Sequence, residues 1–496
     1  MSAVTPKALV IGGGVGGLAG AIRLAKLGWD VELFERLDRV GGKMNELRVG
    51  AYRWDTGPSL MTMPDIIAEL FEFAGERIED HVSLVPVDPV CRYYWPDGSE
   101  LDTHADQERM RAALDAFAPG SGAEYERFFR YTRSIYEAAA GVFLETPFHE
   151  MRHLLQPKNL SALRSLPRID PVRTLHQSVK RLFSDPRLVQ LFDRYATYNG
   201  SSPYEAPATL NIIPYVEFGL GGYYAEGGMY RIMEAMVALA EKLGVTIHTG
   251  ALVERIIHDG TRAHGLKVNG EIIYADAILS NMDVVMTHRH LIDGFETQTR
   301  KLEQLEPSLS GMIFFWGVKG RHDRLAHHNI FFSEDYRQEF NRIFIDRRAP
   351  DDPTVYVAIT QKHDGTHAPR GSENWFVLLN MPYLYGDRDW ERETRKMRKA
   401  VLRTLRRHGL EIEDKIEVER VWTPVDFYRR WASNRGSIYG LSSNGRAAAF
   451  QRPANRSRIL DGLYFAGGST HPGGGVPLCM LSGRHAATLA HEFHAG

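Results

Sequence analysis

The sequence predicts an α/β fold in which one parallel sheet is assembled from separated stretches of the chain. At the start, an apolar strand over 7–11 is followed by a glycine-rich turn, a helical pattern and a second strand over 30–34. In the middle, a helix over 229–243 leads to a buried strand over 277–281. Near the end, a strand over 462–466 precedes another glycine-rich turn and a last helix. Strands that alternate with helices favour parallel pairing, so we expect these stretches to meet in one sheet.

The stretches between them predict a second unit of mixed structure. Residues 105–220 are mostly helical in pattern, with basic and aromatic side chains interleaved. Residues 290–415 combine a basic helix over 390–408 with strands at 311–318, 354–359 and 375–379. We expect the parallel-sheet unit to comprise residues 1–80, 227–288 and 415–496, and an inserted α+β unit to comprise residues 81–226 and 289–414.

The composition of the 496 residues is that of an ordinary globular protein, with 43% hydrophobic and 25% charged residues. The 60 basic and 62 acidic residues leave a formal net charge of −2, which gives no electrostatic footprint for nucleic acid. Cys91 and Cys479 are too few for a disulfide framework, so we expect a reducing compartment. The 20 histidines form no ligand pattern with carboxylates at helical spacing, and we predict no metal site.

The sequence pattern contains no targeting or membrane-spanning segment. Residues 1–7 are too short and too polar for a signal peptide, and no apolar run reaches the roughly 18 residues of a spanning helix. Residues 125–185 mix Phe, Leu, Tyr and Arg at helical spacing. This mixture is typical of a helix on a membrane surface and equally of an ordinary inserted helical unit, so both alternatives stay open.

The first glycine-rich turn has the spacing of a dinucleotide-binding turn. Gly12 allows a tight turn, Gly14 lets the backbone approach a pyrophosphate, and Gly17 lets helix and strand pack closely. The start of the helix, Val15-Gly16, supplies N–H groups and a partial positive charge for the phosphates. Glu35 ends the second strand, where it can accept hydrogen bonds from a ribose diol and disfavours a 2′-phosphate.

Three further stretches favour FAD over NAD as the nucleotide. Residues 38–43 extend the phosphate cradle with a glycine pair and a cation, residues 54–59 offer a tight turn for a ring system, and residues 465–477 present backbone N–H groups between the last strand and the last helix. The expected cofactor-contacting residues are Gly12, Gly14, Val15, Gly16, Gly17, Glu35, Gly42, Lys43, Gly57, Pro58, Ser59, Val253, Gly467, Gly475, Val476 and Pro477.

Taken together, these strings resemble the bacterial carotenoid desaturases, a group within the flavin-containing amine-oxidase-like superfamily. The resemblance covers essentially the whole chain and rests on IGGGVGGL, ERLDRVGGK, DTGPSLMTMPDI, YAEGGMYRI and GLYFAGGSTHPGGGVPLCMLSG. The last string is the most specific, because amine oxidases usually place an acid where Gly467-Gly468 stands here. The resemblance implies non-covalent FAD in an extended Rossmann-type domain, a long apolar tunnel in the inserted unit, and peripheral attachment to the inner face of the membrane, on the cytoplasmic side.

Within this group, residues 194–208, 326–336 and 371–382 look most like the hydroxycarotenoid 3,4-desaturases. Phytoene or diapophytoene desaturases and carotenoid end-group oxidases share several of these strings and remain alternatives. More remote alternatives are a flavin amine oxidase, an isomerase that uses reduced FAD, and a flavin-binding escort protein. The resemblance implies an acyclic carotenoid as the substrate and dioxygen or a quinone as the final electron acceptor.

Desaturation removes a hydride and a proton, and the flavin takes the hydride. The sequence contains no nucleophile–base motif, so candidates for the proton are few. Arg194 and Tyr198, with Tyr195 between them, could form a buried cation–phenol pair that takes or relays a proton; the alternative is a structural arginine among core tyrosines.

Three histidines are weaker candidates for contact with a ligand. Either His327 or His328 could bind a terminal hydroxyl, and since adjacent residues of a strand face opposite ways, at most one would serve. His471 could touch the flavin or shape its turn.

Overall fold

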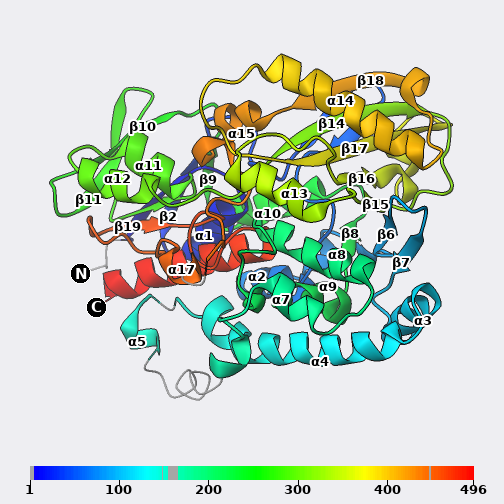
Figure 1. Ribbon diagram of the computed structural model, residues 1–496. Helices are drawn as coiled ribbons and strands as arrows, with labels where there is room; N and C mark the ends of the chain where they lie inside the picture. Colours follow the sequence, from blue (N-terminus) through cyan, green and yellow to red (C-terminus); the bar gives the residue numbers. More distant parts are fainter. Residues whose placement is uncertain (1–4, 148, 155–165, 446–447, 496) are drawn as a thin grey trace.

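A computed structural model describes residues 5–147, 149–154, 166–445 and 448–495. Its first layer is a five-stranded sheet in which every pairing is parallel, and this confirms the predicted α/β fold (Figure 1). The strands come from the start, middle and end of the chain as expected. In spatial order they are β19 (Leu463–Phe465), β13 (Ala277–Ser280), β1 (Lys7–Ile11), β2 (Asp30–Phe34) and β9 (Thr246–His248).

The first and last long helices pack directly against each other beside this sheet. α1 (Val15–Lys26) is drawn in blue and α17 (Val476–Ala495) in red in Figure 1. The backbones come so close that a Cβ on Gly483 would lie 2.4 Å from the carbonyl oxygen of Gly16. This packing brings the C-terminal glycine-rich turn to the N-terminus of α1. The neighbouring helices are α2 (Pro64–Ala74) and α10 (Tyr230–Lys242).

A second, seven-stranded sheet forms the core of the other half. α14 (Trp390–Arg407), drawn in yellow in Figure 1, covers one face of this sheet, where Val401 and Leu405 pack in the same core as Phe314 and Trp316. The pairings are antiparallel except for a parallel pair between its third- and second-last strands. In spatial order the strands are β18 (Ile416–Trp422), β14 (Ser310–Lys319), β17 (Ser372–Met381), β16 (Val355–Ile359), β15 (His328–Phe331), β6 (Cys91–Tyr94) and β7 (Glu100–Thr103).

Helices cover the remaining side of this half, as the pattern over 105–220 predicts. They are α3 (Gln107–Phe117), α4 (Ser121–Ala139), α7 (Leu175–Lys180), α8 (Pro186–Asp193) and α9 (Ile212–Leu220), with the short helix η4 (Arg194–Asn199) between the last two. The short helix α5 (Met151–Leu154) lies apart from them, and its Arg152 pairs with Glu492 of α17. Phe128, Phe183 and Phe192 build an aromatic core among them. Within the described part of the chain, none of the helices combines the length and apolar character needed to cross a membrane.

Smaller elements complete both halves. They are β3 (Glu46–Val49), β4 (Tyr52–Asp55), β5 (Leu84–Pro86), β8 (Tyr223–Ala225), β10 (Val253–His258), β11 (Ala263–Val268), β12 (Glu271–Tyr274), α11 (Val284–Leu291), α12 (Glu296–Glu303), α13 (Tyr336–Phe340), α15 (Pro424–Trp431) and α16 (Ala448–Gln451). The expected division of the chain into two units stays a prediction. Because β18 pairs with β14 in the larger sheet, we propose that the last segment of the parallel-sheet unit begins after Trp422 instead of at residue 415.

Candidate active site

One continuous cavity of about 1000 Å³ runs from the N-terminus of α1 to the inner face of the seven-stranded sheet. Its wall includes every expected cofactor-contacting residue except Gly17, and it also includes Arg194 and Tyr198. Residues predicted from separate stretches of sequence therefore meet around one space.

The turn before α1 leaves backbone N–H groups available to a ligand. Gly12 has a φ of +88°, and neither a side-chain cap nor an acidic residue occupies the first turn of α1. A Cβ on Gly14 would lie 2.6 Å from Nδ2 of Asn281, so a side chain there cannot be accommodated without movement. Gly17 lies behind the turn, where a Cβ would come within 2.2 Å of the carbonyl oxygen of Gly12. Its place fits the packing role predicted for it, while the other glycines leave a helix start whose free N–H groups could accept an anion.

Glu35 is held at the end of β2 by two backbone donors. Its Oε2 accepts a hydrogen bond from the N–H of Gly13 at 2.9 Å, and its Oε1 accepts one from Leu37 at 2.9 Å. The backbone N–H of Ala251 donates to the carbonyl of Glu35 at 2.9 Å and so places the chain leading to Val253 beside this carboxylate. The arrangement fits a ribose that contacts an acid at the end of the second strand.

The C-terminal glycine-rich turn closes the same end of the cavity. Gly467 and Gly475 have φ values of +107° and +115°, in the left-handed region. A Cβ on Gly16 would lie 2.9 Å from the N–H nitrogen of Gly467, so the two turns touch. Behind the turn, the buried guanidinium of Arg452 donates to the carbonyls of Gly468 and Leu441 at 3.0 and 3.1 Å, and burial lowers its pKa to about 10.

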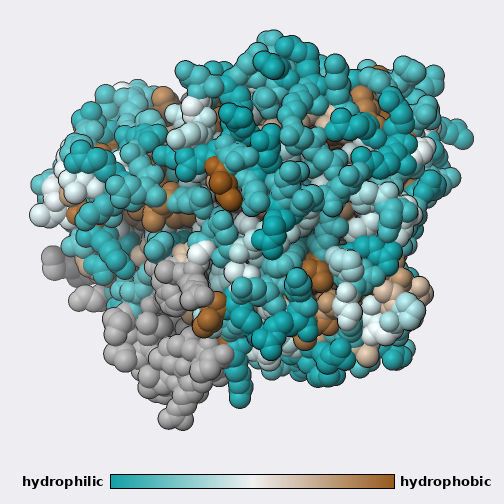
Figure 2. All heavy atoms as spheres, in the orientation of Figure 1, coloured by the Kyte–Doolittle hydropathy of each residue, from teal (hydrophilic) through white to brown (hydrophobic). Residues whose placement is uncertain are grey.

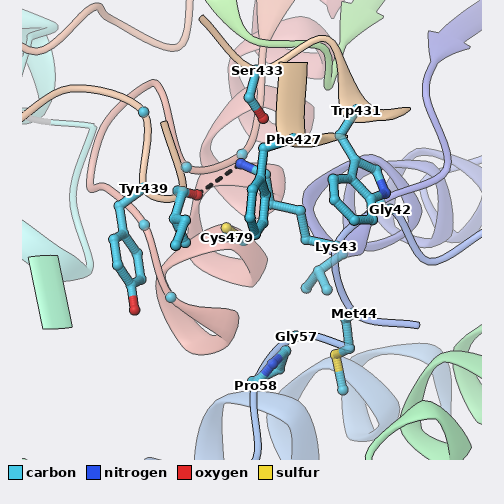
Figure 3. A pocket seen from close by; sticks show the side chains of 18 of the residues that line it. Gly42, Lys43, Met44, Gly57, Pro58, Phe427, Trp431, Ser433, Tyr439 and Cys479 are labelled. Carbon is cyan, nitrogen blue, oxygen red and sulfur yellow. Dashed lines mark hydrogen bonds between the residues drawn. The ribbon is translucent and has the colours of Figure 1, made fainter. Parts of the chain in front are cut away.

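Lys43 lines the cavity between these two turns. Its ammonium donates to the carbonyl of Ile438 at 2.7 Å, the bond drawn as a dashed line in Figure 3. Burial lowers the pKa of Lys43. Phe427 and Trp431 of α15 lie beside this side chain in Figure 3. Open backbone donors at two glycine turns, a fixed carboxylate and a nearby cation are together polar groups that suit an extended dinucleotide such as FAD.

The inner face of the seven-stranded sheet gives the cavity an apolar wall. Phe376 and Leu378 of β17, two residues apart, both line it, as do Ile313 of β14 and Ile330 of β15. Alternate residues of a strand point to one face of a sheet. The opposite face of the same strands packs against α14, so this wall is rigidly supported.

A buried polar network faces that apolar wall. Nη2 of Arg194 donates to the hydroxyl of Tyr93 at 2.6 Å and lies 3.8 Å from Oε1 of Glu217. The hydroxyl of Tyr195 donates to Oε1 of Glu217 at 2.6 Å, and the hydroxyl of Tyr198 donates to its Oε2. Burial, followed by the charge of Glu217, raises the pKa of both phenols well above its usual value, so both keep their protons.

Glu217 was not predicted from the sequence, although it lines the cavity together with Arg194 and Tyr198. It lies on α9, where it is the single charged residue of the apolar string IIPYVEFGL. A buried carboxylate without a partner would be costly, so a lone Glu in an apolar helix indicates a partner elsewhere in the fold. The sequence therefore indicates that Glu217 has a buried partner, but no pattern in it identifies which residues the partners are.

The two adjacent histidines face different surroundings, as strand geometry predicts. His328 lines the cavity, and its Nδ1 lies 2.9 Å from the carbonyl oxygen of Val90. Burial lowers the pKa of His328 to about 4, so the ring is neutral near pH 7. His327 is not in the cavity wall and pairs instead with His363, with 2.7 Å between their Nδ1 atoms.

His471 is buried behind the glycine-rich turn. Its Nε2 lies 3.0 Å from the carbonyl oxygen of Thr146, and it does not line the cavity. This position favours the interpretation in which it shapes the turn. Within the described ranges, no group of three His, Cys, Asp or Glu residues could hold a metal ion.

Comparison with known proteins identifies the family to which the chain is similar. The family model for flavin containing amine oxidoreductase matches residues 15–491. The chain is 40% identical over 490 residues to the 1-hydroxycarotenoid 3,4-desaturase of Flavobacterium sp. (strain P99-3), covering 99% of this chain and 100% of the relative. It is 39% identical over 485 residues to the 4,4'-diapolycopene oxygenase of Methylomonas sp, covering 96% of each chain. It is 36% identical over 489 residues to the zeta-carotene-forming phytoene desaturase of Myxococcus xanthus, covering 98% of this chain and 94% of the relative.

Solved structures agree on the architecture. Putrescine oxidase bound to putrescine matches with a TM-score of 0.62 at 14% identity, covering 99% of this chain and 100% of the other. Cyclohexylamine oxidase from Brevibacterium oxydans matches with a TM-score of 0.61 at 16% identity and the same coverage. These likenesses show a shared fold.

Proposed function

The chain belongs to the family of flavin-containing amine oxidoreductases, and we propose that it is a desaturase of acyclic carotenoids that acts on 1-hydroxycarotenoids at the C3–C4 bond. Family membership makes it an FAD-dependent oxidoreductase. The observation that supports the narrower proposal is the continuity of this cavity, in which a cofactor cradle opens directly onto an apolar wall and a buried polar network. The substrate follows the name of the relative that is 40% identical along the whole chain.

The residues divide into two roles in this proposal. The glycine turns, Glu35, the neighbourhood of Lys43 and the start of β10 hold FAD, which supplies the two-electron acceptor for the hydride when it is bound. The apolar wall of Ile313, Ile330, Phe376 and Leu378 orients the hydrocarbon and excludes water.

The polar network takes the proton that leaves with the hydride. Tyr198 donates its hydroxyl proton to Glu217, so a substrate proton accepted by the phenol oxygen can pass on to the carboxylate. Arg194 lies 3.8 Å from that carboxylate, so its guanidinium faces the group that we propose as the final proton acceptor. We propose Arg194 and Tyr198 as the catalytic residues predicted from the sequence, with Glu217 as the final proton acceptor.

We also propose peripheral contact with the cytoplasmic face of a membrane, where an apolar substrate dissolves. The exposed side of α4 carries Arg127, Arg130 and Arg133 beside Glu126 and Glu137, and Arg133 pairs with Glu137, so Arg127 and Arg130 are the cations that suit an anionic lipid surface. Apolar residues form only small separate groups on the face drawn in Figure 2, so contact through charged side chains suits that face better than insertion. Residue 148 and residues 155–165 of the 125–185 stretch lie outside the described residues. The reoxidising acceptor is dioxygen or a membrane quinone.

Expression in hosts that accumulate different acyclic carotenoids tests the proposal, with pigment mass and absorbance as readouts. Loss of two hydrogens from a 1-hydroxylated carotenoid, with a red-shifted spectrum, is the expected result. Desaturation of phytoene in its place would make the chain a phytoene desaturase. If every pigment stays unchanged while the protein is folded and flavin-loaded, the carotenoid proposal is wrong.

A carotenoid oxygenase is the second candidate, because the diapolycopene oxygenase relative is 39% identical, almost as similar as the desaturase. The two reactions differ in atom balance. An oxygenase adds oxygen to the pigment, whereas a desaturase removes two hydrogens, so one mass spectrum of the product separates them.

A further inference from the structure

Tyr439 presents a hydroxyl group to the cavity that no other described side chain uses. Its backbone N–H donates to Oγ of Ser308 at 3.0 Å, while its own hydroxyl has no hydrogen-bond partner in the described part of the chain. Figure 3 shows the ring extending into the pocket. Burial raises the pKa of this phenol, so it keeps its proton and remains a donor.

Two other phenols of this cavity already have partners, and a third, Tyr428, lies on α15 at the cofactor end. Tyr198 donates to Glu217, and the hydroxyl of Tyr356 lies 2.5 Å from Oγ of Ser59. The hydroxyl of Tyr336 lacks a partner, but it is enclosed by packed side chains and has no exposed surface. Buried hydroxyls normally find a partner, so an accessible and unpaired one in an apolar cavity points to a ligand oxygen.

Tyr439 lies where the cofactor cradle meets the substrate wall. A Cβ on Gly474, in the C-terminal glycine-rich turn, would lie 3.0 Å from Cβ of Tyr439. A Cβ on Gly200, directly after the helix η4 that carries Arg194 and Tyr198, would lie 2.8 Å from its Cδ2. The ring is therefore packed between the turn that closes the FAD site and the segment that carries the proposed catalytic residues.

The positions of the substrate's groups match this location. In a 1-hydroxycarotenoid that reacts at C3–C4, one carbon separates the hydroxyl-bearing carbon from the reacting bond. A group that recognises the hydroxyl must therefore lie beside the cofactor turn, and a group at the distant end of the cavity cannot reach it. We propose that the Tyr439 hydroxyl binds the C1 hydroxyl of the substrate and thereby positions C3–C4 for hydride transfer. This assignment rests on the proposed function.

The test compares Tyr439→Phe with the unchanged holoenzyme on two substrates, a 1-hydroxycarotenoid and the same carotenoid without the hydroxyl. We expect the ratio of their kcat/KM values to fall about three- to tenfold, the worth of one neutral hydrogen bond, through loss on the hydroxylated substrate alone. Tyr356→Phe removes a phenol of the same cavity whose hydroxyl is bonded to Ser59, and it should leave the ratio unchanged.

The outcomes separate this inference from the proposed function. If Tyr439→Phe carries normal FAD but leaves the ratio unchanged, or slows both substrates equally, the hydroxyl is not read by Tyr439. If the variant fails to hold FAD, the unchanged enzyme still tests the inference through its ratio of kcat/KM values on the two substrates. A ratio near one would mean that no residue recognises the hydroxyl, and the inference would be wrong. If the unchanged enzyme converts neither substrate, the proposed function itself is wrong.

Discussion

The two ends of the cavity are built from different parts of the chain. At the cofactor end the wall is largely backbone, with glycines such as Gly14, Gly16 and Gly467 where a side chain would collide. At the substrate end the wall is made of side chains, such as Phe376 and Glu217. A backbone surface binds a common cofactor and permits little change, whereas a side-chain surface can change with the substrate. The cofactor end therefore indicates the family of the protein, and the substrate end determines which substrate fits.

The largest effect should follow a substitution at the backbone end. In Gly16→Val, the new Cβ would lie 2.9 Å from the backbone nitrogen of Gly467 and 2.7 Å from Oδ1 of Asn281. Backbone cannot yield as a flexible side chain can, so we expect FAD binding to be lost, as measured by flavin absorbance per protein. Gly365→Ala is the control, since nothing lies within 4 Å of a Cβ there and it should keep its flavin. A yellow Gly16→Val protein would contradict this picture of the cofactor end.

A smaller but selective effect should follow at the side-chain end. Glu217→Gln leaves Arg194 without its anionic neighbour and removes the proposed proton acceptor. We expect kcat to fall on the order of a thousandfold, within the range of general-base contributions, while FAD content stays normal. Glu339→Gln is a matched control, because it removes another buried carboxylate of the same half that does not line the cavity. If Glu217→Gln keeps its turnover, the network of Arg194, Tyr198 and Glu217 has a structural role and does not transfer the proton.

The smallest effect concerns stability and pH. Burial raises the pKa of Glu339 from 4.5 to about 7. Between these values the folded chain binds a proton that the unfolded chain releases, so the free energy of unfolding should decrease as pH rises from 4.5 to 7, by roughly 3 kcal/mol at most, and then level off. Glu339→Gln should lack this part of the slope in denaturation experiments. Parallel pH profiles for the two proteins would show that Glu339 does not titrate in this range.

The same contrast explains what the sequence could predict. The order β1–α1–β2, the acid Glu35 at the end of β2 and the distant turn at Gly467 follow from local patterns, because each needs particular residues at fixed spacing. Glu217 and Tyr439 follow from no such pattern, since their neighbours are set by the packing of α9 and the C-terminal turn. The seven-strand order was also beyond prediction: β15 pairs in parallel with β6, more than 200 residues earlier in the chain.

The contact between α1 and α17 has a consequence for how the protein is made in the cell. The glycine-rich turn before α1 leaves the ribosome more than 400 residues ahead of the C-terminal glycine-rich turn that lies against it. A nascent chain therefore cannot hold its cofactor until α17 has been released and has folded back against α1. Flavin binding then depends on the folding step that brings the two glycine-rich turns together, and a chain cut before α17 should not retain the cofactor.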